Sequence, residues 1–402
     1  MTLLRNVNIK TQDSPSIDAF ARFRVSTPDT IFDSKQIVDN SPLFWDDQEV
    51  SGATTTSTYS KPYARSRLGV ALNTAGKRVR QTFQRFNYQS GKSQLMILTG
   101  VIGTGASGIT GEIGLFDDNN GLFFRNDDAV MSVVVRSSGT GSPVDTVVAQ
   151  SNWNKDQMDG TGASGYTLDF SKTQIFFIDF EWLGAGRVRF GFFIDGIPYY
   201  CHESLHANEL DVVYMSTPNL PFRYSIENDG TGVASTLDHI CTSVTTEGGN
   251  SDLGLLRYAS TEGAHVNADV VGTLYAVIGI RLKTTALSTV VKILSMSMFS
   301  ETSDSYEWVL VLNPTVASTF TYSDSTNSSV QIARGATANT ITGGTKVAGG
   351  LAATSSGILE RVETIRYLGS TIAGVSDTVV LCVRPLSALA DIHGALTWRE
   401  LV

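Results

Sequence analysis

Two stretches of the chain contain residues whose types and spacing could bind a metal ion. The first is HESLH at 202–206, which matches H-E-x-x-H, a pattern in which two histidines one helical turn apart hold zinc and the glutamate activates a bound water. That chemistry requires a helix, whereas the preceding IPYYC (197–201) reads as a strand. If the strand continues, the two imidazoles lie about 13 Å apart and cannot share a metal. We therefore expect ordinary strand-end residues here and no zinc.

The second stretch is Asp117-Asp118-Asn119, followed by Asn120-Gly121. Carboxylate and amide oxygens suit calcium. The same residues also suit a tight hairpin turn, which is our first expectation, with calcium as the alternative. No glycine pattern of a nucleophile elbow, a phosphate loop or a dinucleotide fold appears in a suitable strand–turn–helix setting. The sequence thus predicts no catalytic residue, no cofactor and no enzyme.

The segment 174–200, QIFFIDFEWLGAGRVRFGFFIDGIPYY, indicates how such residues are positioned. Apolar side chains occupy alternate, even-numbered positions in both halves, as in strands with one buried face. A three-residue loop, Gly184-Ala185-Gly186, with Gly186 left-handed, would pair Trp182 with Val188 and Glu181 with Arg189 on the wet face. Asp195-Gly196 reads as a type I′ turn that pairs Tyr199 with Phe192 and Cys201 with Phe190.

The composition predicts an all-β protein. Of 402 residues, 42% are hydrophobic and only 17% charged, and glycine is frequent at 37. Alternating segments with short polar turns follow one another from about residue 41 to the chain's end, and EGGNS (247–251) is a plausible boundary. We expect an N-terminal arm (1–40), a first antiparallel sandwich of jelly-roll or concanavalin-like type (41–250) and a second antiparallel sandwich (251–402).

Charge is unevenly distributed along the acidic chain. The net charge is −9, yet the stretch from Lys61 to Lys92 contains eight basic residues and no acidic one. Its candidates for a surface that docks an acidic partner are Arg65, Arg67, Lys77, Arg78, Arg80 and Arg85. The alternative is pairing within the chain. A pI near 5.1 argues against nucleic acid as a partner.

Three cysteines, Cys201, Cys241 and Cys382, are too few and too scattered for a disulfide framework, so we expect free thiols and cytoplasmic synthesis. The start MTLLRNVNIK is not a signal peptide, and no apolar run approaches the length of a membrane span. We therefore expect neither secretion by the general route nor a membrane partner.

Both ends of the chain are similar to a known family. DAFARFRVSTPDTIFDSKQ (18–36), DNSPLFWDDQEVSG (39–52), YEWVLVLNPTV (306–316) and TGGTKVAGG (342–350) resemble virion structural proteins of tailed bacteriophages, particularly marine and environmental ones. The central VRFGFFIDG (188–196) also looks like concanavalin A-like or laminin-G-like sandwiches, which often bind glycans.

The resemblance implies a virion protein, as a capsid decoration, a head fibre or a tail-associated part. It would be mounted on other virion proteins through its arm and would be a homo-oligomer, most simply a trimer. The arm residues expected to anchor it are Phe20, Phe23, Arg24, Phe32 and Trp45, unless they pack against their own first domain. The alternative function is a receptor-binding module that grips a host-surface glycan, and a hydrolase is the remote one.

Overall fold

The computed structural model describes residues 16–25, 27–302, 305–317, 319–353, 357–362 and 366–401. The described residues form antiparallel β-strands joined by turns and by short 3₁₀ segments at Lys61–Tyr63, Gln150–Asn152 and Thr284–Ala286. The predicted all-β sandwich class is confirmed. Among these residues, none of the helical segments has the length and apolar character needed to cross a membrane.

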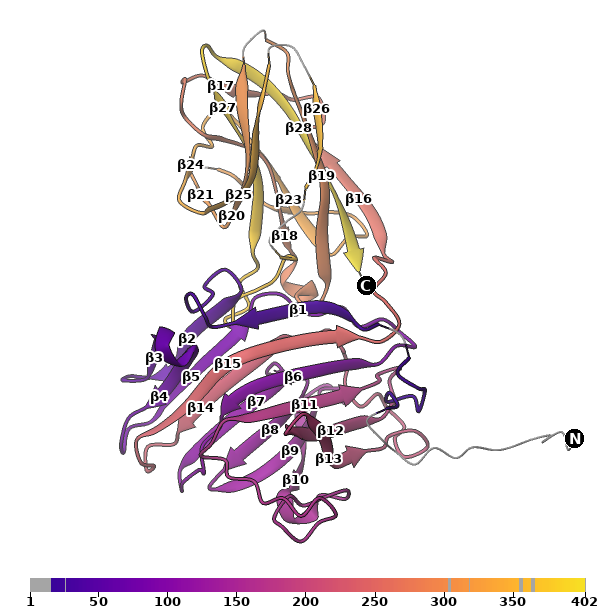
Figure 1. The fold of residues 1–402 in the computed structure, drawn as a ribbon. Coiled ribbons are helices and arrows are strands. Elements are labelled where there is room, and N and C mark those ends of the chain that lie inside the picture. Colours follow the sequence, from indigo (N-terminus) through magenta and orange to yellow (C-terminus); the bar gives the residue numbers. More distant parts are fainter. Residues whose placement is uncertain are drawn as a thin grey trace, which may run out of the picture. The chain divides into compact units, whose positions relative to one another are not determined.

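The chain divides into two compact units. Unit 1 comprises the residues up to Pro42, Asp47–Arg80 and Tyr88–Asn250, and unit 2 comprises Leu43–Asp46, Gln81–Asn87 and Ser251 onward. Figure 1 shows each unit as layered sheets. Short pieces of the N-terminal third thus contribute to unit 2.

Unit 1 contains two large sheets. The first has eight strands: β1 (Asp29–Lys35), β3 (Thr56–Ser60), β4 (Arg65–Val70), β6 (Gln94–Val101), β11 (Gln174–Phe180), β12 (Val188–Ile194), β13 (Ile197–Ser204) and β15 (Ser235–Thr246). Their order is β13-β12-β11-β6-β15-β4-β3, with β1 paired to β15. The second has seven strands in the order β10-β9-β8-β7-β14-β5-β2. These are β2 (Trp45–Gly52), β5 (Gly76–Thr82), β7 (Ile109–Phe116), β8 (Gly121–Asp127), β9 (Val130–Ser137), β10 (Val144–Ala149) and β14 (Phe222–Asn228).

Unit 2 is built on a five-stranded and a six-stranded sheet. The five-stranded sheet has the order β16-β28-β19-β26, with β17 also paired to β28. Its strands are β16 (Leu255–Ser260), β17 (Val266–Ala268), β19 (Val290–Ser300), β26 (Ile358–Arg361) and β28 (Ala390–Leu401). The six-stranded sheet contains β18 (Tyr275–Leu282), β20 (Tyr306–Leu312), β22 (Ser323–Asp324), β23 (Val330–Arg334), β25 (Thr345–Ala352) and β27 (Thr378–Pro385). A small pair joins β21 (Thr315–Val316) to β24 (Ile341–Thr342).

The meander of β11, β12 and β13 has the predicted buried face. Phe124 from the opposite sheet lies among Phe176, Phe190 and Phe192, with ring centroids 5.0, 5.6 and 5.2 Å away. The Asp195-Gly196 turn is confirmed, since both residues have positive φ (53° and 79°) and Ile194 pairs with Ile197. Such φ values define a type I′ turn, and this turn closes the second hairpin.

The predicted register of the first hairpin is wrong by two residues. Phe180 pairs with Val188, and Asp179, not Glu181, lies opposite Arg189. The loop is longer because the Glu181 amide donates to the Arg187 carbonyl (3.0 Å) and the Gly186 amide donates to Trp182 (2.8 Å). The left-handed residues of this loop are Leu183 and Gly184, with φ of 39° and 82°, and not Gly186. Both the predicted and the observed register keep the apolar, even-numbered residues on the same face. The two registers differ only in the length of the loop.

The end of the second hairpin also departs from the prediction. Tyr199 pairs with Phe192 as expected. A bulge at Cys201 then shifts the ladder, so that His202 and not Cys201 lies opposite Phe190. An extra residue in one strand changes the face of everything beyond it, which alternation alone does not reveal.

The outward face of the meander is covered, not wet. Residues 16–25 lie across it: the Arg189 guanidinium donates to the Ile17 carbonyl (3.0 Å), and Arg187 donates to the Ala19 carbonyl (3.1 Å). Arg24 pairs with Asp179 and with Glu247, at 2.8 Å from the latter. Ile17 and Asp179 are consequently buried. The described part of the expected arm therefore belongs to unit 1, and its first fifteen residues lie outside the described ones.

Candidate ligand-binding site on the second unit

A concave surface of unit 2 lies over strand β28. Apolar residues such as Ile392, Leu396 and Trp398 are buried, while the odd-numbered Asp391 and His393 alternate with them on the outer face. In this register β16 places Tyr258 beside Thr397, and β19 places Phe299 beside His393. Three strands with period-two alternation thus bring distant residues onto one outward face.

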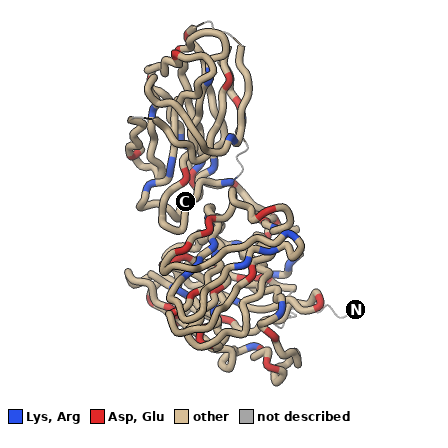
Figure 2. Tube along the Cα trace, turned by 90° about the vertical axis from the view of Figure 1, so that its left-hand side faces the viewer, with Lys and Arg blue, Asp and Glu red and all other residues tan. Residues whose placement is uncertain are grey.

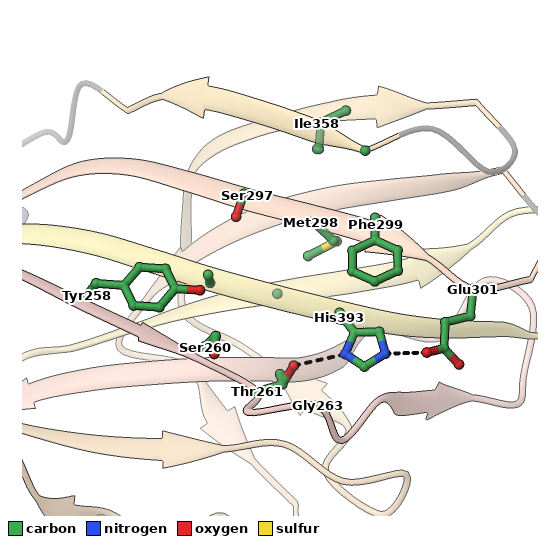
Figure 3. A pocket seen from close by; sticks show the side chains of 13 residues that line it. Tyr258, Ser260, Thr261, Gly263, Ser297, Met298, Phe299, Glu301, Ile358 and His393 are labelled. Carbon is green, nitrogen blue, oxygen red and sulfur yellow. Dashed lines mark hydrogen bonds and ion pairs between the residues drawn. The ribbon is translucent and has the colours of Figure 1, made fainter.

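These residues line a cavity of about 520 Å³, which we call the β28 hollow. Side chains on its lining that can contact a ligand are Tyr258, Ser260, Thr261, Ser297, Phe299, Glu301 and His393 (Figure 3). Tyr258 is 66% and Phe299 46% exposed, so two aromatic rings are presented to solvent on a floor of small and hydroxyl-bearing residues. Exposed aromatic rings beside a few convergent polar groups are typical of a binding site.

His393 contacts three other residues that line one end of the β28 hollow. Its Nε2 lies 2.8 Å from Glu301 Oε1 and its Nδ1 lies 3.3 Å from Thr261 Oγ1, as Figure 3 shows. Its ring stacks on Phe299, with 4.8 Å between centroids. The hydrogen bond with His393 holds the pKa of Glu301 below its ordinary value. Glu301 is therefore an anionic acceptor at the rim of the hollow.

The H-E-x-x-H residues do not form one centre. His202 and Glu203 lie on β13, whereas His206 follows the strand. His202 Nδ1 accepts from the Asn154 amide (3.3 Å), while His206 lies 2.6 Å from the Gly186 carbonyl and stacks on Tyr214. Each imidazole is engaged separately.

Asp117 and its neighbours form the turn between β7 and β8. Asp117 Oδ1 accepts from the amides of Asn119 (2.8 Å) and Asn120 (2.9 Å), and Asp118 pairs with Arg223. The carboxylates of the candidate calcium site thus have partners within the chain.

Most of the basic candidates are paired inside unit 1. Arg65 and Arg67 both contact Asp238, at 2.8 and 2.6 Å, and Arg78 contacts Asp47 at 2.6 Å. Arg80 is fully buried and pairs with Asp47 at 3.2 Å. Lys77 pairs with Glu227 at 2.9 Å. Figure 2 shows the basic and acidic positions interspersed in this unit. Arg85 lies in the piece of the chain that belongs to unit 2.

The anchoring candidates have different surroundings. Phe32 is buried 6.2 Å from the ring of Phe222, and Trp45 is also buried. Arg24 is engaged by Asp179 and Glu247, and the ring of Phe20 carries the Arg22 guanidinium at 4.6 Å. Phe23 is 60% exposed and is the only one of these five candidates in the exposed class.

The outer face of the seven-stranded sheet in unit 1 is a rival location. Glu112 accepts from Arg125 (2.9 Å) and from Ser225 (2.8 Å), and Asp145 accepts from Arg125 and Arg136. Burial would raise the pKa of Asp145, but the bonds from Arg136 and Arg125 outweigh it and hold the pKa below its ordinary value. These acidic and basic side chains form ion pairs with one another, so fewer polar groups are open to a ligand here than in the β28 hollow.

The residues of the β28 hollow were not predicted from the sequence. The alternation of ADIHGALTWREL (390–401) was a usable signal, because it places Asp391 and His393 on the polar side of a strand. Tyr258 and Phe299 lie 135 and 94 residues before His393 in the sequence, and no local pattern reveals that these strands pair.

Comparisons with known proteins identify no family. No protein-family model matches the chain, and no curated protein matches it. Among solved structures, the chain is similar to a Bacillus licheniformis beta-glucanase (10% identity, TM-score 0.34, 55% of this chain and 99% of that one). It is also similar to the CBM2 module of the evolved Dit of Lactobacillus casei BL23 phage J-1 (9%, 0.36, 56% and 98%). A third is a legume lectin-like domain from Entamoeba histolytica (11%, 0.32, 55% and 98%). At these values the likeness carries no argument about function.

Proposed function

We propose that this protein binds carbohydrate through the β28 hollow and that it acts by adhesion, without catalysis. The observation that supports this is the pair of solvent-facing rings, Tyr258 and Phe299, on a strip of hydroxyl-bearing residues with the Glu301 carboxylate at its rim. A sugar ring has apolar C–H faces that stack on aromatic rings and hydroxyls that bond to such polar groups.

A glycan array probed with the full-length chain tests this proposal. We expect wild type to retain a restricted set of glycans, and Tyr258→Ala and Phe299→Ala to lose them. Tyr63→Ala is the matched control, because Tyr63 lies in unit 1 and is 66% exposed, like Tyr258. An empty array, or retention by both hollow variants, would refute the proposal. Release of sugar from a retained glycan would refute the non-catalytic part.

We further propose that the protein is part of a tailed-phage virion, where glycan binding would serve host attachment. The support is the resemblance of segments 18–36 and 306–316 to virion structural proteins. Antibody labelling of purified particles tests it, and a particle fraction that lacks the protein would contradict it. The oligomeric state, proposed as a trimer, is tested by light scattering of the purified chain, with a monomer as the contrary result.

A further inference from the structure

At the rim of the β28 hollow, Glu301 and His393 are joined by His265, a side chain that does not line the hollow. His265 directly precedes β17, and the β17–β28 register brings it beside His393, with 6.1 Å between ring centroids. Glu301 directly follows β19, and its amide donates to the Asp391 carbonyl at 2.8 Å. The neighbouring strands β17, β28 and β19 therefore bring two imidazoles and a carboxylate to one place.

The spacing of these groups fits one metal ion. One ligand atom from each of His265, Glu301 and His393 lies within 4.8 Å of the others. The two Glu301 oxygens lie 2.8 Å from His393 Nε2 and 3.4 Å from His265 Nδ1. A tetrahedral ion with ligand bonds of about 2.0–2.2 Å separates its ligand atoms by about 3.3–3.6 Å. His265 and Glu301 are 43% and 49% exposed, so both have room to adjust.

The far nitrogen of each imidazole also has an oxygen next to it. His393 Nδ1 lies 3.3 Å from Thr261 Oγ1, and His265 Nε2 lies 3.8 Å from Asp391 Oδ1. This Asp391 oxygen is buried and accepts no hydrogen bond from the described residues. Metal-binding histidines commonly donate their other ring N–H to such an oxygen, which orients the ring toward the metal.

We propose that His265, Glu301 and His393 bind a divalent transition-metal ion of the zinc type, with Thr261 and Asp391 orienting the two imidazoles. Mixed imidazole and carboxylate ligands favour zinc-like ions over calcium or magnesium, which prefer all-oxygen sites. Three protein ligands leave a further position for water or for an oxygen of a ligand in the adjoining hollow. This proposal is independent of the carbohydrate proposal, because metal binding is measured without a glycan.

The test is a titration of the full-length, tag-free chain with Zn²⁺ alone, by calorimetry and by competition with a chromophoric chelator. We expect one equivalent to bind, with an affinity more than about 100-fold lower in His265→Ala and His393→Ala. Thr261→Val and Asp391→Asn should each lower the affinity about 10- to 100-fold while the stoichiometry stays at one. His202→Ala is the matched control: it removes a histidine of the H-E-x-x-H motif and should change nothing.

Two further readouts separate loss of the site from loss of the fold. Zn²⁺ should raise the thermal unfolding midpoint of wild type but not of His265→Ala, whose midpoint without metal should equal that of wild type. Co²⁺ in place of Zn²⁺ should give the visible absorption of a four-coordinate ion in wild type only. The proposal is overturned if zinc does not bind stoichiometrically, if His265→Ala and His393→Ala bind like wild type, or if His202→Ala alone loses binding.

Discussion

Asp179 and Arg189 face each other directly across the β11–β12 pair, and both side chains are fully buried. The carboxylate also accepts from Ser93 Oγ at 2.7 Å and from Arg24 of the N-terminal segment. A pair that strand alternation alone would place in water is thus sealed beneath residues 16–25. The carboxylate of Asp179 accepts from two guanidinium groups and a hydroxyl, and the Arg189 guanidinium also donates to the Ile17 carbonyl.

Asp179→Asn should strongly destabilise unit 1. The substitution preserves size but leaves the buried Arg189 guanidinium without its counter-charge, a change that costs about 3–5 kcal/mol in comparable buried pairs. The measurement is urea unfolding of the full-length chain. Asp33→Asn is the control, because Asp33 and its partner Lys35 are about half exposed, and it should leave the curve unchanged. Equal curves for both variants would show that the buried pair is not stabilising.

Unit 1 should lose stability as the pH falls from about 7 to 5. Burial, together with the positive charge of Arg80, holds the pKa of His239 well below its ordinary value of 6.5. The unfolded chain therefore takes up a proton below pH 6.5 that the folded chain refuses, which lowers stability by up to about 1.4 kcal/mol per pH unit. Burial lowers the pKa of His202 and of His206 in the same direction.

The measurement is the urea midpoint over a series of pH values. In His239→Gln the slope below pH 6.5 should be shallower, because the substituted side chain does not titrate and its amide oxygen can still accept from Arg80 Nε. A slope identical to that of wild type would mean that His239 does not carry the effect.

Leu183→Gly should stabilise the β11–β12 hairpin. Leu183 has φ of 39° and is 55% exposed, so its side chain is strained without burying much surface. Left-handed backbone costs a non-glycine residue about 1–2 kcal/mol, and glycine avoids this cost. Part of the gain is lost because glycine increases the conformational entropy of the unfolded chain. A net gain of about 0.5–1 kcal/mol in thermal or urea unfolding is expected. Leu205→Gly, at another exposed loop leucine that lacks positive φ, should give no gain.

The fold class, the buried stripe and the Asp195-Gly196 turn could be predicted because each depends on neighbours in sequence. The register of the first hairpin could not be predicted, because loops that differ by two residues in length leave the same side chains on the buried face. The burial of Asp179 depends on residues 16–25, about 155 positions away, and nothing local to either segment announces the contact. The β28 hollow could not be predicted for the same reason, since Phe299 and His393 become neighbours only through strand pairing.

Tyr258 should contribute to glycan binding mainly through its ring. Tyr258→Phe keeps the stacking face and should bind the best array glycan within about threefold of wild type, whereas Tyr258→Ala should lose about tenfold, the equivalent of one aromatic contact. The measurement is a calorimetric titration of the full-length variants with that glycan. If Tyr258→Phe were as defective as Tyr258→Ala, the hydroxyl and not the ring would be the determinant.

Strand β28 also sets the spacing between the two exposed aromatic rings. Its outward residues recur every second position, so Thr397 beside Tyr258 and His393 beside Phe299 are separated by about 13 Å along the strand. A ligand that touches both aromatic rings must be longer than a single sugar ring and fairly straight. The protein should therefore discriminate between glycans by their length. It should bind extended oligosaccharides more tightly than free monosaccharides.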